Sequence, residues 1–216
     1  MKIVENIRHL RWAQKVRRVV YARRLRKTIY GQFAFIHINK CGGTSIEAAL
    51  NLPKTHDTAQ QRRDKIGRDH WERIPSFALI RNPYAKVTSH YRYRVKTNQT
   101  GLGSRDIGLN EWVRRTYGEK DPEYYDKPLM FAPCIDWITD EAGEIMVDLV
   151  VRLEEIDINM PQIEELIGKE IVLPKANTTS RKDGTTEDSL DSKSIAIIND
   201  YFQKDFEAFG YVQRET

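Results

Sequence analysis

Three short runs dominated by apolar residues stand out along the chain. They are FAFIHI (33–38), SFALIR (76–81) and VDLVVRLE (147–154). Each run has the length of a strand, and the continuous apolar character of such runs is typical of strands covered on both faces. Helical patterns alternate with them. We therefore expect an α/β fold in three layers, with a central parallel sheet flanked by helices.

The helical patterns follow each of these runs. A helix is predicted over 44–50, and Asn82-Pro83 supplies an N-cap and a proline at the first position of a second helix that continues to about Lys96. Short helices are expected around 109–116, 133–139 and 159–167, and a glycine-containing loop over 98–108. A polar, charged stretch (54–73) leads into the second strand. One last helix carries an apolar face of Ile195, Ile198, Phe202, Phe206 and Phe209.

The first 30 residues differ from the rest in charge, because they are strongly basic with apolar residues at loosely helical spacing. We expect segment 1–30 to be a helix docked on the domain. The alternative is contact with an acidic partner or peripheral contact with an anionic membrane surface. No nucleic-acid-binding motif accompanies it. Residues 31–216 are expected to form one domain.

Composition narrows the setting of the protein. The chain has 216 residues, 40% of them hydrophobic, and a net charge of +4, which mildly favours anionic ligands. It shows no apolar run long enough for a membrane span and no secretory signal. Cys41 and Cys134, its two cysteines, provide neither a disulfide framework nor a metal-binding pair. These features predict a cytoplasmic protein.

The segment after the first strand, NKCGGTS (39–45), has the character of a phosphate-binding loop. Ligands of parallel sheets bind beyond the carboxyl ends of the strands. Gly42 and Gly43 allow close approach of the backbone, and the N–H groups at the start of the next helix attract an anion. Lys40 adds a positive charge, and Thr44 and Ser45 add hydroxyl donors. A purely structural Gly-Gly turn is the alternative.

Two familiar chemistries do not match this loop. An ATP or GTP hydrolase has its lysine after the last glycine and an acidic strand end that holds magnesium, whereas Lys40 precedes the glycines and Arg81 ends the second strand. We therefore expect no metal. A cysteine phosphatase has an arginine six residues after its cysteine, where this chain has Glu47.

The second strand runs into RNPYAKVTSHY (81–91). Together with NKCGGTS, this segment resembles the motifs of sulfotransferases that use 3′-phosphoadenosine 5′-phosphosulfate (PAPS). The carbohydrate-type branch has the patterns PK-x-GG-T-S and RNPY-x-x-x-x-S-x-Y. The resemblance extends from residue 33 to 211 through HDTA (56–59), VRLE (151–154), NTTSRKDG (177–184) and a terminal FGY. Asn39 departs from it, because proline is usual at that position.

The resemblance implies a P-loop nucleotide-hydrolase-like sulfotransferase fold and a set of site residues. The 5′-phosphosulfate would be held by Lys40, Cys41, Gly42, Gly43, Thr44 and Ser45. Lys40 would also neutralise charge on the oxygen that leaves with the product, 3′-phosphoadenosine 5′-phosphate (PAP). Arg81 and Ser89 would bind the 3′-phosphate. Ser180, Arg181 and Lys182 resemble a segment that closes over the same phosphate, although a solvated run of charges is the alternative.

Attack of an acceptor hydroxyl on sulfur requires a base. His56 matches the histidine of an H-x-T-A segment that supplies the base in the carbohydrate-type branch, and His70 is the second candidate. The acceptor is expected to be a carbohydrate, and aromatic side chains could stack on its rings or simply be core. The candidates for stacking are Trp71, Trp112, Tyr117, Tyr124, Tyr125 and Trp137.

The sequence thus predicts an enzyme that transfers a sulfuryl group from PAPS to a hydroxyl, with a histidine base and no metal. A nucleotide-binding module without catalysis and a small kinase-like enzyme are the alternatives. The identity of the acceptor and the oligomeric state do not follow from the sequence.

Overall fold

The computed structural model describes residues 31–173 and 184–216. Strands β1 (Ala34–Ile36), β2 (Ser76–Ile80) and β3 (Leu149–Arg152) form a parallel sheet in the order β1-β2-β3. Phe35 is paired with Phe77, and Ala78 with Val150. Each strand lies inside its predicted run, so the predicted parallel α/β architecture is confirmed. Segment 1–30 and Ser180, Arg181 and Lys182 lie outside the described residues.

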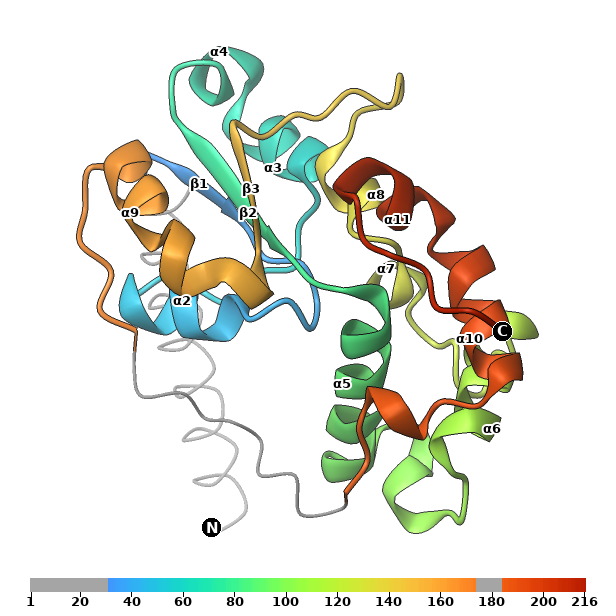
Figure 1. The fold of residues 1–216 in the computed structure, drawn as a ribbon. Helices are drawn as coiled ribbons and strands as arrows, with labels where there is room; N and C mark the ends of the chain where they lie inside the picture. Colours follow the sequence, from blue (N-terminus) through green and yellow to red (C-terminus); the bar gives the residue numbers. More distant parts are fainter. Residues whose placement is uncertain (1–30, 174–183) are drawn as a thin grey trace, which may run out of the picture.

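Helices follow each of the three strands along the chain (Figure 1). Helices α2 (Gly43–Ala49), α3 (Ala59–Ile66) and α4 (Arg68–Trp71) join β1 to β2. The path from β2 to β3 contains α5 (Pro83–Lys96), η1 (Gln99–Ser104), α6 (Leu109–Val113), the π-helical turn η2 (Arg114–Gly118), α7 (Pro128–Phe131) and α8 (Ile135–Ile138). After β3 come η3 (Leu153–Glu155), α9 (Ile156–Ile167), η4 (Glu187–Ser189), α10 (Ser192–Tyr201) and α11 (Gln203–Phe209).

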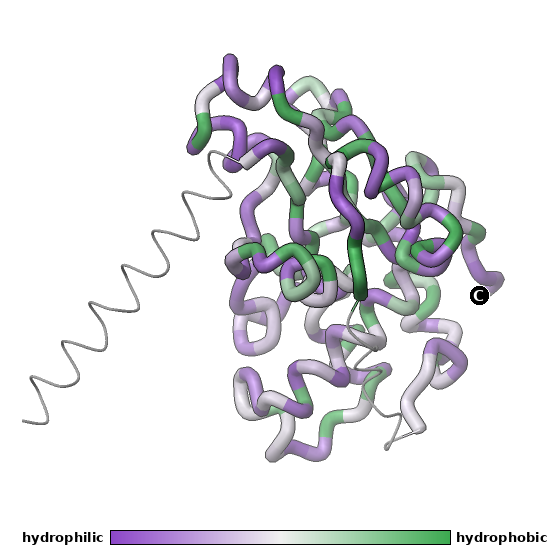
Figure 2. The backbone as a smooth tube through the Cα atoms, turned by 90° about the vertical axis from the view of Figure 1, so that its left-hand side faces the viewer, coloured by the Kyte–Doolittle hydropathy of each residue, from purple (hydrophilic) through white to green (hydrophobic). Residues whose placement is uncertain are grey.

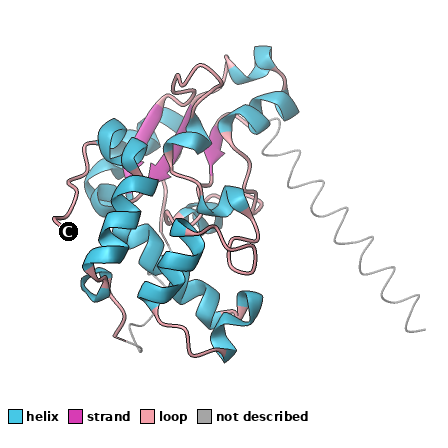
Figure 3. Cartoon of the chain, turned by 90° about the vertical axis from the view of Figure 1, so that its right-hand side faces the viewer, coloured by secondary structure: helices cyan, strands magenta, loops and turns pink. Residues whose placement is uncertain are grey.

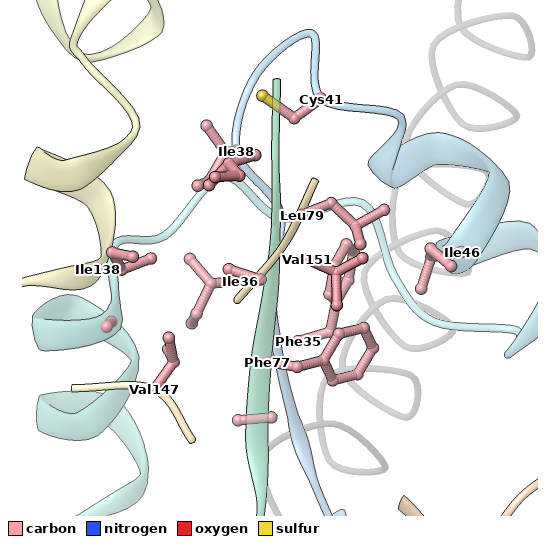
Figure 4. Packing of buried hydrophobic residues seen from close by; sticks show 14 of the residues in the cluster. Phe35, Ile36, Ile38, Cys41, Ile46, Phe77, Leu79, Ile138, Val147 and Val151 are labelled. Atoms are coloured by element: carbon pink, nitrogen blue, oxygen red, sulfur yellow. The ribbon is translucent and has the colours of Figure 1, made fainter. Parts of the chain in front are cut away.

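Alternate residues of the strands serve opposite faces of the sheet, as the pleat requires. Figure 4 shows Phe35, Phe77 and Val151 on the side of α2, where Ile46 meets them, and Ile36 on the other side near Ile138. All six are buried. Helices on both faces explain why these strands are apolar throughout instead of alternating with polar residues.

A second apolar cluster lies beside the sheet, in the part of the fold that contains helices and loops but no strand (Figure 3). Its members include Trp112 from α6, Phe131 from α7 and Phe202, which follows α10. Figure 2 shows the hydrophobic segments of the tube running through the middle of the molecule and hydrophilic ones along its outer turns. None of the helices within the described ranges is long and apolar enough to cross a membrane.

The structure differs from the sequence prediction in several regions. The predicted loop 98–108 contains η1, and α7 was not predicted. The polar stretch 54–73 contains α3 and α4, and the capping box of Thr58 and Gln61 starts α3 although only Ala59 and Arg62 of that helix are buried. The single last helix predicted from the apolar face is in fact two, because the chain breaks at Phe202 between α10 and α11.

Candidate active site

The loop between β1 and α2 has a backbone that depends on its glycines. Gly42 has φ +78°, and a Cβ added there would lie 2.6 Å from Leu153 Cδ1. A Cβ on Gly43 would lie 2.2 Å from His37 Cδ2. Gly42 therefore requires glycine for its conformation, and Gly43 requires it for space, because real Cβ atoms do not approach a ring this closely. The loop therefore packs tightly against β1 and η3.

Lys40 lies in this loop with its ammonium against the ring of Tyr93, 4.0 Å from the ring centroid. Its own backbone is left-handed, with φ 65°. The Arg81 guanidinium donates to the carbonyl of Lys40 through Nη1 at 3.3 Å. Burial, with the positive charges of Arg81 and Arg92, lowers the pKa of Lys40 from 10.5 to about 8. Three cations thus converge on the loop, which is a setting that favours an anion.

Helix α5 contributes residues to the site from one of its faces. Ser89, Arg92 and Tyr93 are spaced three and four residues apart, so they lie next to one another on the helix surface. Ser89 is half-buried. Arg92 donates to the carbonyl of Thr185 at 3.2 Å. The described chain resumes at Gly184, so the segment that follows the predicted Ser180–Lys182 site returns beside the helix that carries Ser89.

The other residues of the loop differ in their exposure to solvent. Thr44 is exposed and Ser45 is half-buried at the start of α2. Cys41 is buried, its N–H donates to the carbonyl of Ile38 at 3.3 Å, and its sulfur lies 3.7 Å from that of Cys134. The Cys41 side chain therefore faces the core, unlike Lys40 and Thr44.

Asn39, which stands where the resembling family has proline, fastens the loop to its neighbour in space. Its side-chain amide donates to the carbonyl of Met130 in α7 at 2.9 Å. The same nitrogen lies 3.5 Å from His90 Nε2 on α5. Asparagine thereby provides a hydrogen bond across the molecule that proline lacks.

His56 lies next to the loop through His37. The two imidazole rings are 4.4 Å apart, and the ring of His37 is the group that abuts Gly43. His56 Nδ1 lies 3.1 Å from the carbonyl oxygen of His37. A carbonyl only accepts, so Nδ1 carries the proton and Nε2 keeps a lone pair. Burial and the neighbouring His37 lower the pKa of His56. This imidazole is thus a neutral acceptor at neutral pH.

Glu47 of α2 holds His37 in its position beside His56. Its Oε1 accepts from His37 Nδ1 at 2.7 Å and from the N–H of Thr55 at 3.2 Å. The carboxylate thereby joins β1, α2 and the segment that carries His56. Glu47 is itself buried.

The other histidines have different surroundings. His70 is on α4, the helix that immediately precedes β2, at the opposite end of the sheet from the α2 loop (Figure 1). His90 is buried against Trp112 and Phe131, and burial with the nearby Arg94, Lys40 and Lys86 charges lowers its pKa well below the ordinary value. His56 is therefore the histidine that combines exposure with a place beside the loop.

Most of the aromatic side chains considered for sugar stacking are core residues. Trp71, Trp112, Tyr117, Tyr124 and Trp137 are buried, and Tyr125 is half-buried with its hydroxyl 2.9 Å from that of Tyr201. Tyr93, which the sequence analysis missed, has 43% of its surface exposed beside Lys40. Its spacing of four residues from Ser89 is the signal that identifies it.

The chain is similar to a known protein family and to a solved structure. The model of a family described as "Sulfotransferase family" matches residues 28–212. A solved structure, described as a sulfotransferase from Alicyclobacillus acidocaldarius, is similar to 88% of this chain and 94% of its own, with 12% sequence identity and a TM-score of 0.34. No curated protein sequence matches the chain. Within the described residues, no group of three or more His, Cys, Asp and Glu side chains could hold a metal ion.

Proposed function

The chain belongs to the sulfotransferase family, and from that premise we propose that it transfers a sulfuryl group from PAPS to a hydroxyl of a carbohydrate acceptor, with His56 as the base. The acceptor class comes from the likeness of NKCGGTS, RNPYAKVTSHY and HDTA to the carbohydrate-type branch.

One observation carries the proposal. The ammonium of Lys40 shares its surroundings with the guanidinium groups of Arg81 and Arg92, at the carboxyl ends of β1 and β2. Their mutual repulsion is unfavourable until an anion enters between them. PAPS carries anionic groups at both its 5′ and 3′ positions, so the charge and the close backbone approach at Gly42 and Gly43 fit it.

Different residues bind the two ends of PAPS and accept the proton of the acceptor. PAPS supplies the sulfuryl group and, as PAP, its leaving group. Lys40 and the backbone of the loop bind the 5′ end, and the Lys40 charge stabilises the oxygen from which sulfur departs. Arg81 and Ser89 bind the 3′-phosphate, Arg81 by charge-assisted hydrogen bonds. His56 accepts the proton of the acceptor hydroxyl at Nε2, because Nδ1 is already committed to the carbonyl of His37.

Calorimetry with PAP tests the donor site without any knowledge of the acceptor. We expect PAP to bind more tightly than ADP, and Lys40→Ala or Arg81→Ala to weaken binding by about tenfold or more, the usual value of a hydrogen bond to a charged group. His56→Ala is expected to leave PAP affinity unchanged. Lys204→Ala is the control, since Lys204 is an exposed lysine of α11. Equal affinity for PAP and ADP would exclude the proposal, and tighter magnesium-dependent binding of ATP would favour a kinase.

Turnover tests the chemical step. The full chain, PAPS and a panel of oligosaccharides are incubated together, and release of PAP and the mass of each sugar are measured. A sulfated sugar is the expected product, and His56→Ala should abolish it while His70→Ala does not. Sulfation that persists in His56→Ala would refute the assignment of the base.

A further inference from the structure

The two cysteines of the chain are in contact on the buried side of the loop between β1 and α2. Cys41 is 1% exposed and Cys134 is fully buried, and their sulfur atoms are 3.7 Å apart although the residues are 93 positions apart in sequence. Figure 4 shows Cys41 beyond the end of β2, with its sulfur directed to the same side as Ile38. Cys41 lies between Lys40 and Gly42, two residues of the proposed donor site. The sulfur contact therefore joins that loop to the segment before α8.

A buried ammonium accompanies the pair. Lys86 of α5 is 2% exposed, donates to the carbonyl of Ala132 at 2.6 Å, and lies 3.6 Å from Cys134 Sγ. Nothing in the proposed sulfuryl transfer uses this lysine. Burial alone raises the pKa of Cys41, but the hydrogen bond with Cys134 and the charges of Lys86 and Arg81 outweigh it and lower that pKa. Burial and the hydrogen bond with Cys41 raise the pKa of Cys134. The pair thus combines a thiol whose pKa is lowered with one whose pKa is raised.

We propose that Cys41 and Cys134 are an oxidation site, at which hydrogen peroxide converts the two thiols into a disulfide. The Cys41 thiolate attacks one oxygen of the peroxide, which breaks the O–O bond and gives a sulfenic acid and hydroxide. The sulfur of Cys134 then attacks Cys41 sulfur, the S–O bond breaks, and the hydroxide leaves as water together with the proton of Cys134. In total two thiols lose two electrons and two protons, and one peroxide is reduced to two water molecules.

Formation of the bond changes the position of Cys41 relative to Cys134. Sulfur atoms in a disulfide are about 2.0 Å apart, so the pair must close by more than an ångström from its present 3.7 Å. Lys40 and Gly42 flank Cys41 in left-handed conformations, with φ 65° and 78°. A shift of the Cys41 backbone would be passed to these two neighbours, of which only Gly42 adopts such a conformation without strain. Oxidation is therefore expected to disturb whatever the loop binds.

Intact-mass and peptide mass spectrometry test the oxidation site directly. The full chain is reduced, freed of reductant and treated with hydrogen peroxide. We expect the loss of two hydrogen atoms, a peptide linking Cys41 to Cys134, and full reversal by dithiothreitol. The chain contains only these two cysteines, so no other internal disulfide can account for the loss. Thiols that stay reduced, or that gain oxygen atoms without cross-linking, would overturn the proposal.

A second measurement asks what the disulfide does, and this part rests on the proposed function. We expect the oxidised protein to bind PAP about tenfold more weakly or worse, in line with the cost of displacing a binding group by about 1 Å. Reduction should restore affinity, and the double variant Cys41→Ser with Cys134→Ala, which has no thiol left, should bind PAP equally before and after peroxide. If reduced protein fails to bind PAP while the cross-link forms, the function is wrong and the oxidation site stands. Unchanged affinity of the cross-linked protein would refute the coupling to the loop.

Discussion

Lys40 has a combination of features that few lysines share. Its backbone is in the left-handed region that favours glycine, its ammonium lies on the ring of Tyr93, and Arg81 and Arg92 add like charges nearby. Each feature alone is unfavourable or weakly favourable for the free protein. Their coincidence at the end of β1 indicates a site that is completed by an anionic ligand, and it gives the residue a measurable signature in its titration.

PAP affinity is expected to depend on pH through Lys40. An anionic ligand binds the protonated ammonium, so binding raises the pKa of Lys40 above its free value of about 8. Affinity is then full below pH 8 and falls as the pH rises through 8, by up to about tenfold per pH unit. Calorimetry across this range measures the slope. Lys40→Arg is the matched control, because a guanidinium stays charged and its affinity should remain flat.

Glu47→Gln is expected to change the titration of His56. The negative charge of Glu47 raises the pKa of His56, which burial and His37 lower. Neutral glutamine keeps an oxygen for His37 Nδ1 and the Thr55 N–H but removes that charge. The pKa of His56 should therefore fall further, and NMR titration of its ring protons should show the transition at lower pH.

The control for this titration is Glu165→Gln, at an exposed glutamate of α9. It should leave the His56 transition where it is. An unchanged transition in Glu47→Gln, or one that moves to higher pH, would contradict the electrostatic link. Among the described side chains that interact with His56, Asp57 is the other anion, and it is retained in both variants.

At the scale of elements, His37, which directly follows β1, packs closely against Gly43 at the start of α2. Gly43 begins α2, and the ring of His37 occupies the space where a Cβ would stand, with Cδ2 2.2 Å and Nε2 2.6 Å from that position. His37 is held in turn by Glu47, one helical turn after Gly43. The start of the helix and the end of the strand are therefore held in one fixed relation.

Gly43→Ala is expected to destabilise the fold by about 1–3 kcal/mol, the usual cost of forcing extra volume into a packed site. Urea unfolding measures the change. Gly108→Ala is the control, since nothing lies within 4 Å of a Cβ there and its φ of −73° suits any residue. Gly108 is the N-cap of α6, where alanine is less favourable than glycine, so that variant should lose at most about 1 kcal/mol. A loss in Gly43→Ala no larger than in Gly108→Ala would mean that the His37 ring moves freely.

The elements also show what sequence patterns could and could not predict. The strands and α5 could be predicted because their signals are local. Apolar runs mark the strands, and Asn82-Pro83 marks the start of α5. Helix α3 was missed because Gln60, Arg63 and Lys65 leave it almost no apolar face, and only its capping box marks it. At the site, the loop and Arg81 were evident from motifs. The contacts of Asn39 with α7 and of Cys41 with Cys134 were not, because they join residues about 90 positions apart.

At the scale of the molecule, two apolar clusters are packed together, one around the sheet and one around Trp112 and Phe131. Lys86 lies where they meet. Its ammonium contacts Cys134 of the first cluster and lies 5.4 Å from the ring of Phe202 in the second. Asp205 of α11 accepts from the N–H groups of Cys134 and Ile135 at 2.7 and 2.9 Å. A buried cation and a buried carboxylate therefore connect the two halves of the core.

Lys86→Met is expected to lower the free energy of unfolding by about 1–3 kcal/mol, since it leaves the buried carbonyl of Ala132 without its donor and removes the charge that favours the ionised form of Asp205. Lys204→Met is the control. Lys204 is also close to an acid, Asp136 at 3.6 Å, but its side chain is 73% exposed, so the expected loss is below about 1 kcal/mol. If the two charges depend on each other, the double variant Lys86→Met with Asp205→Asn should lose less than the sum of the single losses, by about 0.5–3 kcal/mol. Strict additivity would show that Lys86 acts through its contacts with Ala132 and Cys134 alone, and that the two clusters are joined without help from the charge pair.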